Sequence, residues 1–144
     1  MINYWLWVNS GEMDIGDDIS ESEEDVWNGC DRETSKGDKV LIYRTSPYKH
    51  VKYLVEVLEN AKEEEIWTKR GNKIGFTCKF RILKAFKNPL EINQMRNSNG
   101  LKDWYPLKMS FIKMVFKIET EYWDILKEII ITKNPESKDA FNTN

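Results

Sequence analysis

The stretch Ile74-Gly-Phe-Thr-Cys-Lys-Phe-Arg-Ile-Leu-Lys-Ala85 decides the fold class of this 144-residue chain. Along it, apolar side chains alternate with Thr77, Lys79 and Arg81, which is the period-two pattern of a β-strand. Such alternation is typical of an antiparallel sheet that buries one face and leaves the other in water. The sequence therefore predicts a half-buried strand with a basic outer face.

Three more strands are predicted before this one. Tyr4–Val8 is aromatic, β-prone and free of turn-forming residues, so it predicts a buried strand that begins the fold. Lys39–Tyr43 is a short apolar run suited to a central strand. Tyr53–Leu58 follows it as another strand, after an interruption that contains Pro47.

The acidic segment Asn9–Cys30 separates the first two of these strands. Its glycines and polar residues predict a loop, with a short helical turn just before Val26 and Trp27. An exposed linker rarely carries a tryptophan, so we interpret the ring of Trp27 as a candidate functional group.

Helices are predicted mainly in the last third of the chain. Asn88-Pro89 predicts the end of the basic strand, and Glu91–Asn97 predicts a short helix after it. Met109–Ile118 brings back aromatic and β-branched residues and predicts a further strand. From Thr120 to Lys133, apolar side chains recur with helical spacing, so a helix is predicted that packs on the sheet.

This order of elements favours an α+β fold, a curved and mostly antiparallel β-barrel with a few flanking helices. Hydrophobic residues make up 40% of the chain and charged residues 32%, which excludes a disordered protein. We expect one domain over residues 1–135 and a flexible polar tail over residues 136–144.

Several function classes are disfavoured by what the chain lacks. Cys30 and Cys78 form no CxxC motif and His50 is the one histidine, so neither a zinc site nor a His-based triad is supported. No glycine-rich phosphate loop occurs, and no apolar run approaches the roughly 18 residues of a membrane span. We therefore expect a cytoplasmic protein without cofactor or metal, with a monomer as the default state.

Charge is distributed unevenly along the chain. Residues 1–33 carry ten acids and one base, a net charge of −9, whereas residues 34–144 carry 21 bases and 14 acids, a net charge of +7. Between Ile66 and Leu90 there is no acid, and the bases are Lys69, Arg70, Lys73, Lys79, Arg81, Lys84 and Lys87. These bases would bind a polyanion if they face one way, or they form a solvated strand face, and charge alone leaves both readings open.

Six tryptophans are more than one small core requires. Each indole carries an N–H that needs a partner when buried, and stacking a nucleobase on an aromatic ring contributes about 1 to 3 kcal/mol. We assign Trp5 and Trp123 to the core, leave Trp7 and Trp104 open, and favour a functional role for Trp27.

Four blocks of the sequence, in order and spacing, resemble the EVE domain family of the PUA-like superfamily. They are Asn3–Ser10, Val26–Gly29, Ser35–Tyr43 and Tyr53–Val57, and the terminal helix resembles that of compact single-domain members. The resemblance implies a PUA-like fold related to the PUA and YTH domains. It also implies a pocket for a base, often a modified one, that is flipped out of RNA or DNA.

The resemblance further implies which residues surround such a base. By position, the base-binding pocket would contain Trp7, Asn9, Ser10, Trp27, Tyr43, Ser46, Tyr105, Ser110 and Phe111. Flanking phosphates would be neutralised by Arg44, Lys69, Arg70, Lys73, Lys79, Arg81 and Lys84. In this reading, Trp27 and a second aromatic ring sandwich the base, while Asn9 or Ser10 binds its polar edge.

The leading hypothesis is therefore a nucleic-acid-binding module that accepts a modified base without catalysis. A nuclease-like enzyme is an alternative, with Glu12 and Asp31 as its plausible acids. A third reading is a small-molecule or protein-interaction module that uses the same cleft.

Overall fold

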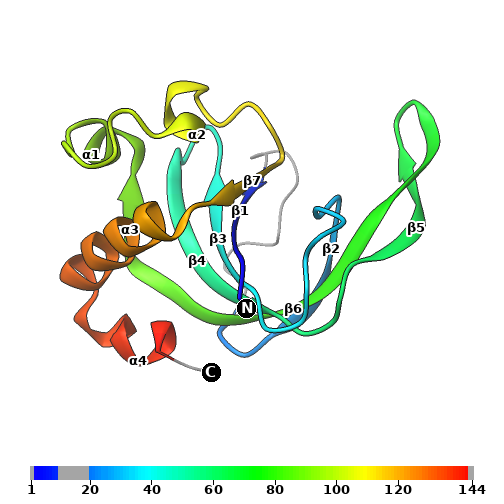
Figure 1. Cartoon of the computed structure of the whole chain (residues 1–144), viewed down its shortest axis with the longest axis horizontal. Helices are drawn as coiled ribbons and strands as arrows, with labels where there is room; N and C mark the ends of the chain where they lie inside the picture. The colour runs from blue at the N-terminus through cyan, green and yellow to red at the C-terminus, as the bar shows by residue number, and fades with distance from the viewer. Residues whose placement is uncertain (1, 10–19, 143–144) are drawn as a thin grey trace.

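The protein is described here by a computed structural model that covers residues 2–9 and 20–142. Within these residues the strands form one mixed sheet of seven, in the order β2-β6-β4-β3-β1-β7, with β5 paired to β6 (Figure 1). The strands are β1 (Tyr4–Asn9), β2 (Glu24–Asn28), β3 (Lys39–Arg44), β4 (His50–Val57), β5 (Lys62–Thr68), β6 (Gly71–Glu91) and β7 (Val115–Ile118).

The strand pairing is mostly antiparallel, as expected. Only β1 and β3 run parallel among the described pairs, with Trp7 opposite Ile42 and Asn9 opposite Arg44. Within the described part of the chain, β2 and β7 end the sheet and do not pair with each other, so the sheet is strongly curved but open. The α+β class is confirmed, and the closed barrel is not.

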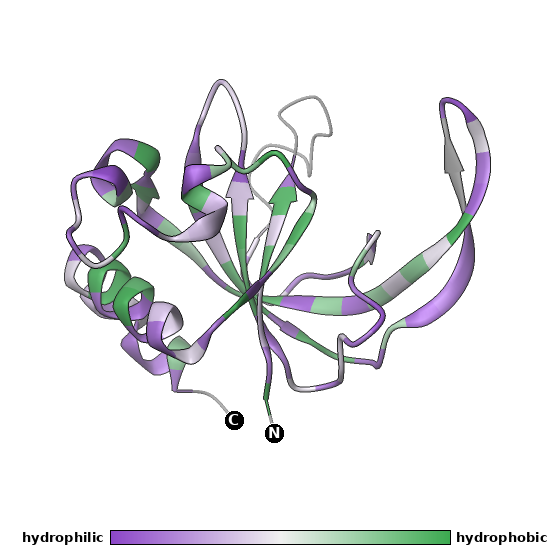
Figure 2. Ribbon diagram, turned by 45° about the horizontal axis from the view of Figure 1, so that its top comes forward, coloured by the Kyte–Doolittle hydropathy of each residue, from purple (hydrophilic) through white to green (hydrophobic). Residues whose placement is uncertain are grey.

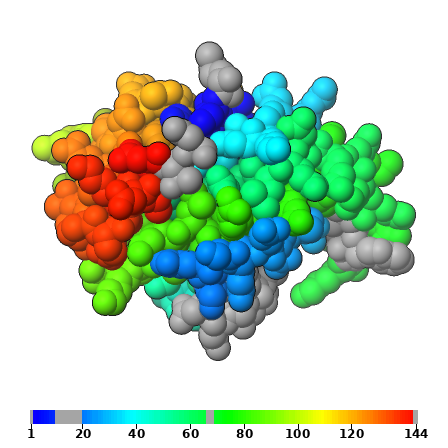
Figure 3. Space-filling view, turned by 90° about the horizontal axis from the view of Figure 1, so that it is seen from below, coloured from blue at the N-terminus to red at the C-terminus, as the bar shows by residue number. Residues whose placement is uncertain are grey.

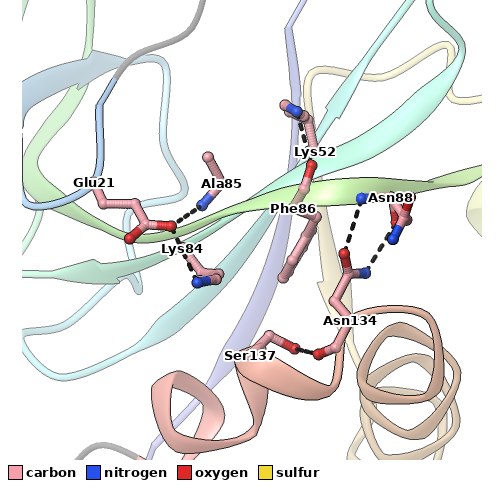
Figure 4. Close-up of polar contacts among 8 residues, drawn as sticks. All are labelled: Glu21, Lys52, Lys84, Ala85, Phe86, Asn88, Asn134 and Ser137. Atoms are coloured by element: carbon pink, nitrogen blue, oxygen red, sulfur yellow. Dashed lines mark hydrogen bonds and ion pairs between the residues drawn. The ribbon is translucent and has the colours of Figure 1, made fainter.

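Strand β6 continues to Glu91, so the prediction that Asn88-Pro89 ends the strand was wrong. The pairing of β4 with β6 is irregular here, which leaves room for a proline that cannot donate a hydrogen bond. Asn134 completes the bonding, because its side chain accepts from the Asn88 N–H at 2.8 Å and donates to the Asn88 carbonyl at 2.9 Å (Figure 4).

The long C-terminal helix is confirmed as α3 (Thr120–Lys133), and the short helix as α1 (Ile92–Arg96). The strand expected over Met109–Ile118 was wrong in its first half. Ser110 and Phe111 have φ values of 51° and 56°, in the left-handed region, which is incompatible with a strand. The remaining helices are α2 (Tyr105–Lys108), η1 (Pro135–Ser137) and α4 (Lys138–Phe141).

Two cores lie on opposite faces of β1, because its side chains alternate and both faces are covered. Leu6 and Val8 join the core under α3, whereas Trp5 and Trp7 join the core under β2. The buried first strand and the central position of Lys39–Tyr43 are therefore confirmed. Hydrophobic residues follow these central strands in Figure 2, while the first part of β5, residues 62–65, is strongly hydrophilic.

Two segments differ from the expectation near β6. Trp27 lies in strand β2, paired opposite Cys78, and not in a loop. Strand β5 was not predicted, because its run of glutamates reads as a solvated face. Together β5 and the start of β6 form a hairpin that projects from the body of the protein (Figure 1).

The end of the chain also differs from the expected flexible polar tail. Ser137 and Phe141 are buried, and the Phe141 ring lies 6.1 Å from Phe86 and 5.9 Å from Trp123. An aromatic side chain in this otherwise polar segment thus packs η1 and α4 against the core.

Candidate functional site

A pocket of about 310 Å³ lies at the edge of the sheet where β1 and β3 end. The parallel pairing brings both carboxyl ends to this edge, and the Thr45 N–H donates to the Asn9 carbonyl at 2.9 Å. Side chains from the end of β3, the following turn, α1 and the α2–β7 connection complete the pocket. Its lining residues are Tyr43, Thr45, Ser46, Lys49, Ile92, Asn93, Arg96 and Ser110.

Backbone strain is concentrated around this pocket. Lys49 and Ser110, which line it, have φ values of 52° and 51°, and Phe111 beside Ser110 has 56°. Residues other than glycine adopt this left-handed backbone region at a cost of order 1 to 3 kcal/mol, and residues strained in this way cluster at functional sites. The surrounding hydrogen bonds hold the strain, including the Ile92 N–H to the Lys49 carbonyl at 3.0 Å.

The pocket has a cationic rim and a neutral floor. Lys49 and Arg96 are exposed at its edge, and no carboxylate is among its described lining residues. Burial raises the pKa of Tyr43 to about 12, although the positive charge of Arg96 acts in the opposite direction. The Tyr43 phenol therefore stays protonated at neutral pH. Its ring stacks on Phe111 with centroids 4.0 Å apart.

The EVE domain family model matches residues 3–129, which is most of the chain. The chain belongs to the EVE domain family. No curated protein matches the sequence. None of the described helices combines the length and apolar character that a membrane span needs.

Solved structures share the fold of this EVE domain at low sequence identity. A hypothetical protein from Leishmania major is 16% identical with a TM-score of 0.69, and the match covers 92% of this chain and 97% of that one. Protein Atu2648 from Agrobacterium tumefaciens is 20% identical with a TM-score of 0.64, over 92% and 93% of the two chains. Rpa0253 from Rhodopseudomonas palustris is 17% identical with a TM-score of 0.65, over 86% and 90%.

Four of the expected base-binding residues lie at the pocket of this EVE domain. Tyr43, Ser46 and Ser110 line it, and Phe111 packs behind Tyr43. Asn9 is buried, and its main-chain carbonyl accepts a hydrogen bond from the N–H of Thr45, a lining residue. These residues come from three separate segments of the chain, so only the tertiary fold brings them together.

Trp7 and Trp27 lie elsewhere, in the core under β2. Their rings stack with centroids 4.7 Å apart, and Phe80 packs edge-on against both. Trp7 is fully buried and Trp27 is 8% exposed. The structure therefore places these two rings against each other and leaves no gap for a base between them.

Tyr105, another expected base-binding residue, is not among the residues that line the pocket. Tyr105 is 52% exposed, packs edge-on against Phe116 and lies under the Lys113 ammonium group, 5.5 Å from it. Ser10 lies outside the described residues.

The expected phosphate-binding residues fall into three groups. Lys79 and Lys84 are ion-paired with Glu24 at 3.2 Å and Glu21 at 3.3 Å, and Arg81 is paired with Glu56. Arg44, at the end of β3, is not a lining residue of the pocket, and its guanidinium group lies over the Tyr48 ring. The others, Lys69, Arg70 and Lys73, are exposed at the end of the projecting hairpin (Figure 1).

The fold brings part of the acidic N-terminal block against the lysines of β6, where opposite charges form ion pairs. Residues of the acidic N-terminal block lie across β6, where Glu21 reaches both Lys84 and the Ala85 N–H (Figure 4). Figure 3 shows the blue residues after position 20 against the green residues of β6. The basic face of β6 is thus partly neutralised within the molecule, and charge alone could not reveal this.

Thr45 lies within the expected stretch from Tyr43 to Ser46. Four other lining residues were missed by the sequence reading: Lys49, Ile92, Asn93 and Arg96. Three of them lie on the predicted short helix, but no spacing in the sequence relates that helix to Tyr43. A signal was available only for Lys49, which lies in the interruption between two predicted strands.

A larger hollow of about 600 Å³ lies on the β5–β6 hairpin. It is open, and it is lined by Glu63, Glu64, Glu65, Asn72, Lys73 and Ile74. Three neighbouring carboxylates make this surface unsuited to a polyanion.

The described part of the chain contains no group of three or more His, Cys, Asp or Glu side chains that could hold a metal ion. Of the two acids named for the nuclease alternative, Glu12 lies outside the described residues. The carboxylate of Asp31 accepts a hydrogen bond from the Glu33 N–H at 2.8 Å, which caps a local turn.

Proposed function

We propose that this EVE domain binds a nucleobase, extruded from a nucleic-acid strand, in the pocket at the ends of β1 and β3. The observation that carries the proposal is the composition of this pocket. It joins hydroxyl, amide and phenol groups with two cations, and no carboxylate is among its described lining residues.

The size and chemistry of the pocket suit a flipped base. Small-ligand pockets have volumes of about 300 to 1,000 Å³, and 310 Å³ lies at the lower end of this range. Ser46, Asn93 and Ser110 supply donors and acceptors for the polar edge of a base. Lys49 and Arg96 at the rim are placed to neutralise the adjoining phosphates.

Energetics limit how selective this pocket is for a modified base. One buried methyl group contributes about 0.8 kcal/mol by transfer, which is less than a tenfold difference in affinity. Most of the affinity then comes from phosphate contacts, so binding weakens steeply as salt concentration rises.

Fluorescence anisotropy with labelled single-stranded nonamers of RNA and DNA tests the proposal. Each nonamer carries either a methylated or a plain base at its centre. Arg96→Gln is expected to weaken binding about tenfold and to reduce the salt slope by about 0.7 for a single strand. Ser110→Gly removes the hydroxyl while keeping the positive φ, and it should weaken binding without loss of stability.

The matched control is Arg32→Gln, because Arg32 is also an exposed arginine but lies outside the pocket. It should bind like the wild type. Equal affinity of the wild type, Arg96→Gln and Ser110→Gly proteins for every nonamer would refute the proposed site.

A further inference from the structure

An exposed aromatic residue, Tyr48, belongs to the turn that supplies two lining residues of the pocket. Tyr48 is 44% exposed, and the residues Ser46 and Lys49, on either side of it in the chain, both line the pocket. A single exposed aromatic residue is common on protein surfaces and needs no explanation by itself. Two neighbouring side chains, however, hold this ring: a half-buried arginine, Arg44, and a buried histidine, His50.

Arg44 covers one face of the Tyr48 ring. The central guanidinium carbon of Arg44 lies 3.9 Å from the centroid of Tyr48 and 5.7 Å from that of Tyr53, which is fully buried. The guanidinium group also contacts Nε2 of His50 at 3.1 Å through Nε and at 3.0 Å through Nη2. The arginine is thereby held by two rings and by a hydrogen-bond acceptor.

His50 stabilises this arrangement from beneath. Its ring is buried and lies 5.5 Å from Tyr48, at an angle of 26°. Burial, with the nearby charges of Arg44 and Lys52, lowers the pKa of His50 to about 4, so the imidazole is neutral and Nε2 can accept from Arg44.

These contacts determine which face of Tyr48 is open. Arg44 and His50 both approach the Tyr48 ring, and they are hydrogen-bonded to each other, so they lie on the same side of it. The exposed area of Tyr48 therefore belongs to the opposite face and the ring edge. A flat ring that is supported from behind and open in front is a pre-organised stacking surface.

We propose that the open face of Tyr48 is a second subsite, which stacks the nucleobase adjacent to the base held in the pocket. The inference rests on the proposed function and extends it from one base to two neighbouring nucleotides. Stacking on tyrosine is independent of base identity, because every base has a flat π-face. Tyr48 is thus a determinant of affinity and of the preferred strand form, and it favours a single strand whose bases are unstacked.

The test removes one base at a time from the probe. Single-stranded nonamers carry a methylated central base and, in two further versions, an abasic site immediately 5′ or 3′ of it. For the wild type, one of the two abasic sites should weaken binding by roughly 5- to 100-fold. Tyr48→Ala should bind the intact nonamer with the affinity that the wild type has for this abasic version, and should not distinguish the two.

Two further variants separate stacking from structural damage. Tyr48→Phe keeps the ring and should retain the sensitivity of the wild type to the abasic site. Ile2→Ala removes a side chain of the same 44% exposure beyond the opposite end of β1, and should also behave as the wild type.

Two outcomes would overturn the subsite, and they are distinguishable. If Tyr48→Ala loses affinity for the abasic nonamer by the same factor as the wild type, the subsite is wrong while the pocket stands. If the wild type binds no nonamer, or if Arg96→Gln and Ser110→Gly bind as the wild type does, the pocket and the subsite both fall.

Discussion

The indole rings of Trp7, on β1, and Trp27, on β2, stack on each other in the core under β2, with centroids 4.7 Å apart and planes inclined by 15°. A base inserted between two rings needs a gap of about 7 Å, twice the roughly 3.4 Å spacing of stacked bases. These rings therefore act as each other's stacking partner in this structure. Their contact anchors strand β2, which lies at the end of the sheet.

Replacing Trp27 by alanine should destabilise the protein by about 3 kcal/mol, because a large buried ring is removed from the core under β2. Trp27→Phe should cost less. Urea unfolding followed by circular dichroism measures both. A Trp27→Ala protein of wild-type stability that has lost oligonucleotide binding would instead assign this ring to the ligand.

The stability of the protein should depend on the ionisation of His50. Its pKa is lowered to about 4 in the folded state from an ordinary value near 6.5, so the unfolded chain binds the proton more tightly. This contribution is fully present above pH 6.5 and is lost as pH falls from about 6.5 to about 4. It amounts to at most about 3 kcal/mol.

The variant His50→Gln isolates this effect, because His50 is the single histidine and glutamine can still accept a hydrogen bond from Arg44. The difference in unfolding free energy between wild type and variant should narrow as pH falls through this window. A constant difference from pH 7 to pH 4 would show that His50 titrates normally.

Removing the acids that lie across β6 should strengthen the binding of polyanions. The double variant Glu21→Gln/Glu24→Gln releases Lys84 and Lys79 from their ion pairs. The salt slope for single-stranded oligonucleotides should then steepen by up to about 1.4, if both cations reach phosphates. Stability should change by less than about 1 kcal/mol, because the first pair is exposed and the second is partly exposed.

The double variant Glu119→Gln/Glu136→Gln carries the same change in net charge at exposed sites outside the ion pairs across β6. If both double variants bind oligonucleotides equally well, net charge alone is responsible and the ion pairs across β6 do not mask the lysines. Anisotropy titrations at 50 mM and 200 mM salt supply the comparison.

The C-terminal segment should contribute to stability through one side chain. Phe141→Ala should lower the free energy of unfolding by about 3 kcal/mol, since its ring packs against Phe86 and Trp123. Lys138→Ala on the same short helix is exposed and should change it by less than about 0.5 kcal/mol. Equal unfolding midpoints for the two variants would mean that the segment does not add to the core.

Local pattern was sufficient for much of the fold. The alternation after Ile74, the apolar run Lys39–Tyr43 and the helical spacing after Thr120 each depend on a single period along the chain, and all three elements form as expected. One error, the expected end of β6, arose where a distant side chain contributes hydrogen bonds. Asn134 hydrogen-bonds both backbone groups of Asn88, so β6 continues past Pro89, which was expected to end it.

The candidate site was accessible from the sequence only in part, for a physical reason. Periodicity reports which face of an element is apolar, so it could predict the burial of Trp5. Tyr43, Ser46 and Ser110 were indicated only by the resemblance to the EVE domain. Periodicity carries no information on which segments meet, and that depends on the parallel pairing of β1 with β3 and on the left-handed backbone at Ser110 and Phe111. Those long-range contacts bring α1 and its Arg96 to the pocket, turn Trp7 and Trp27 toward each other, and bind the acidic block to the lysines of β6.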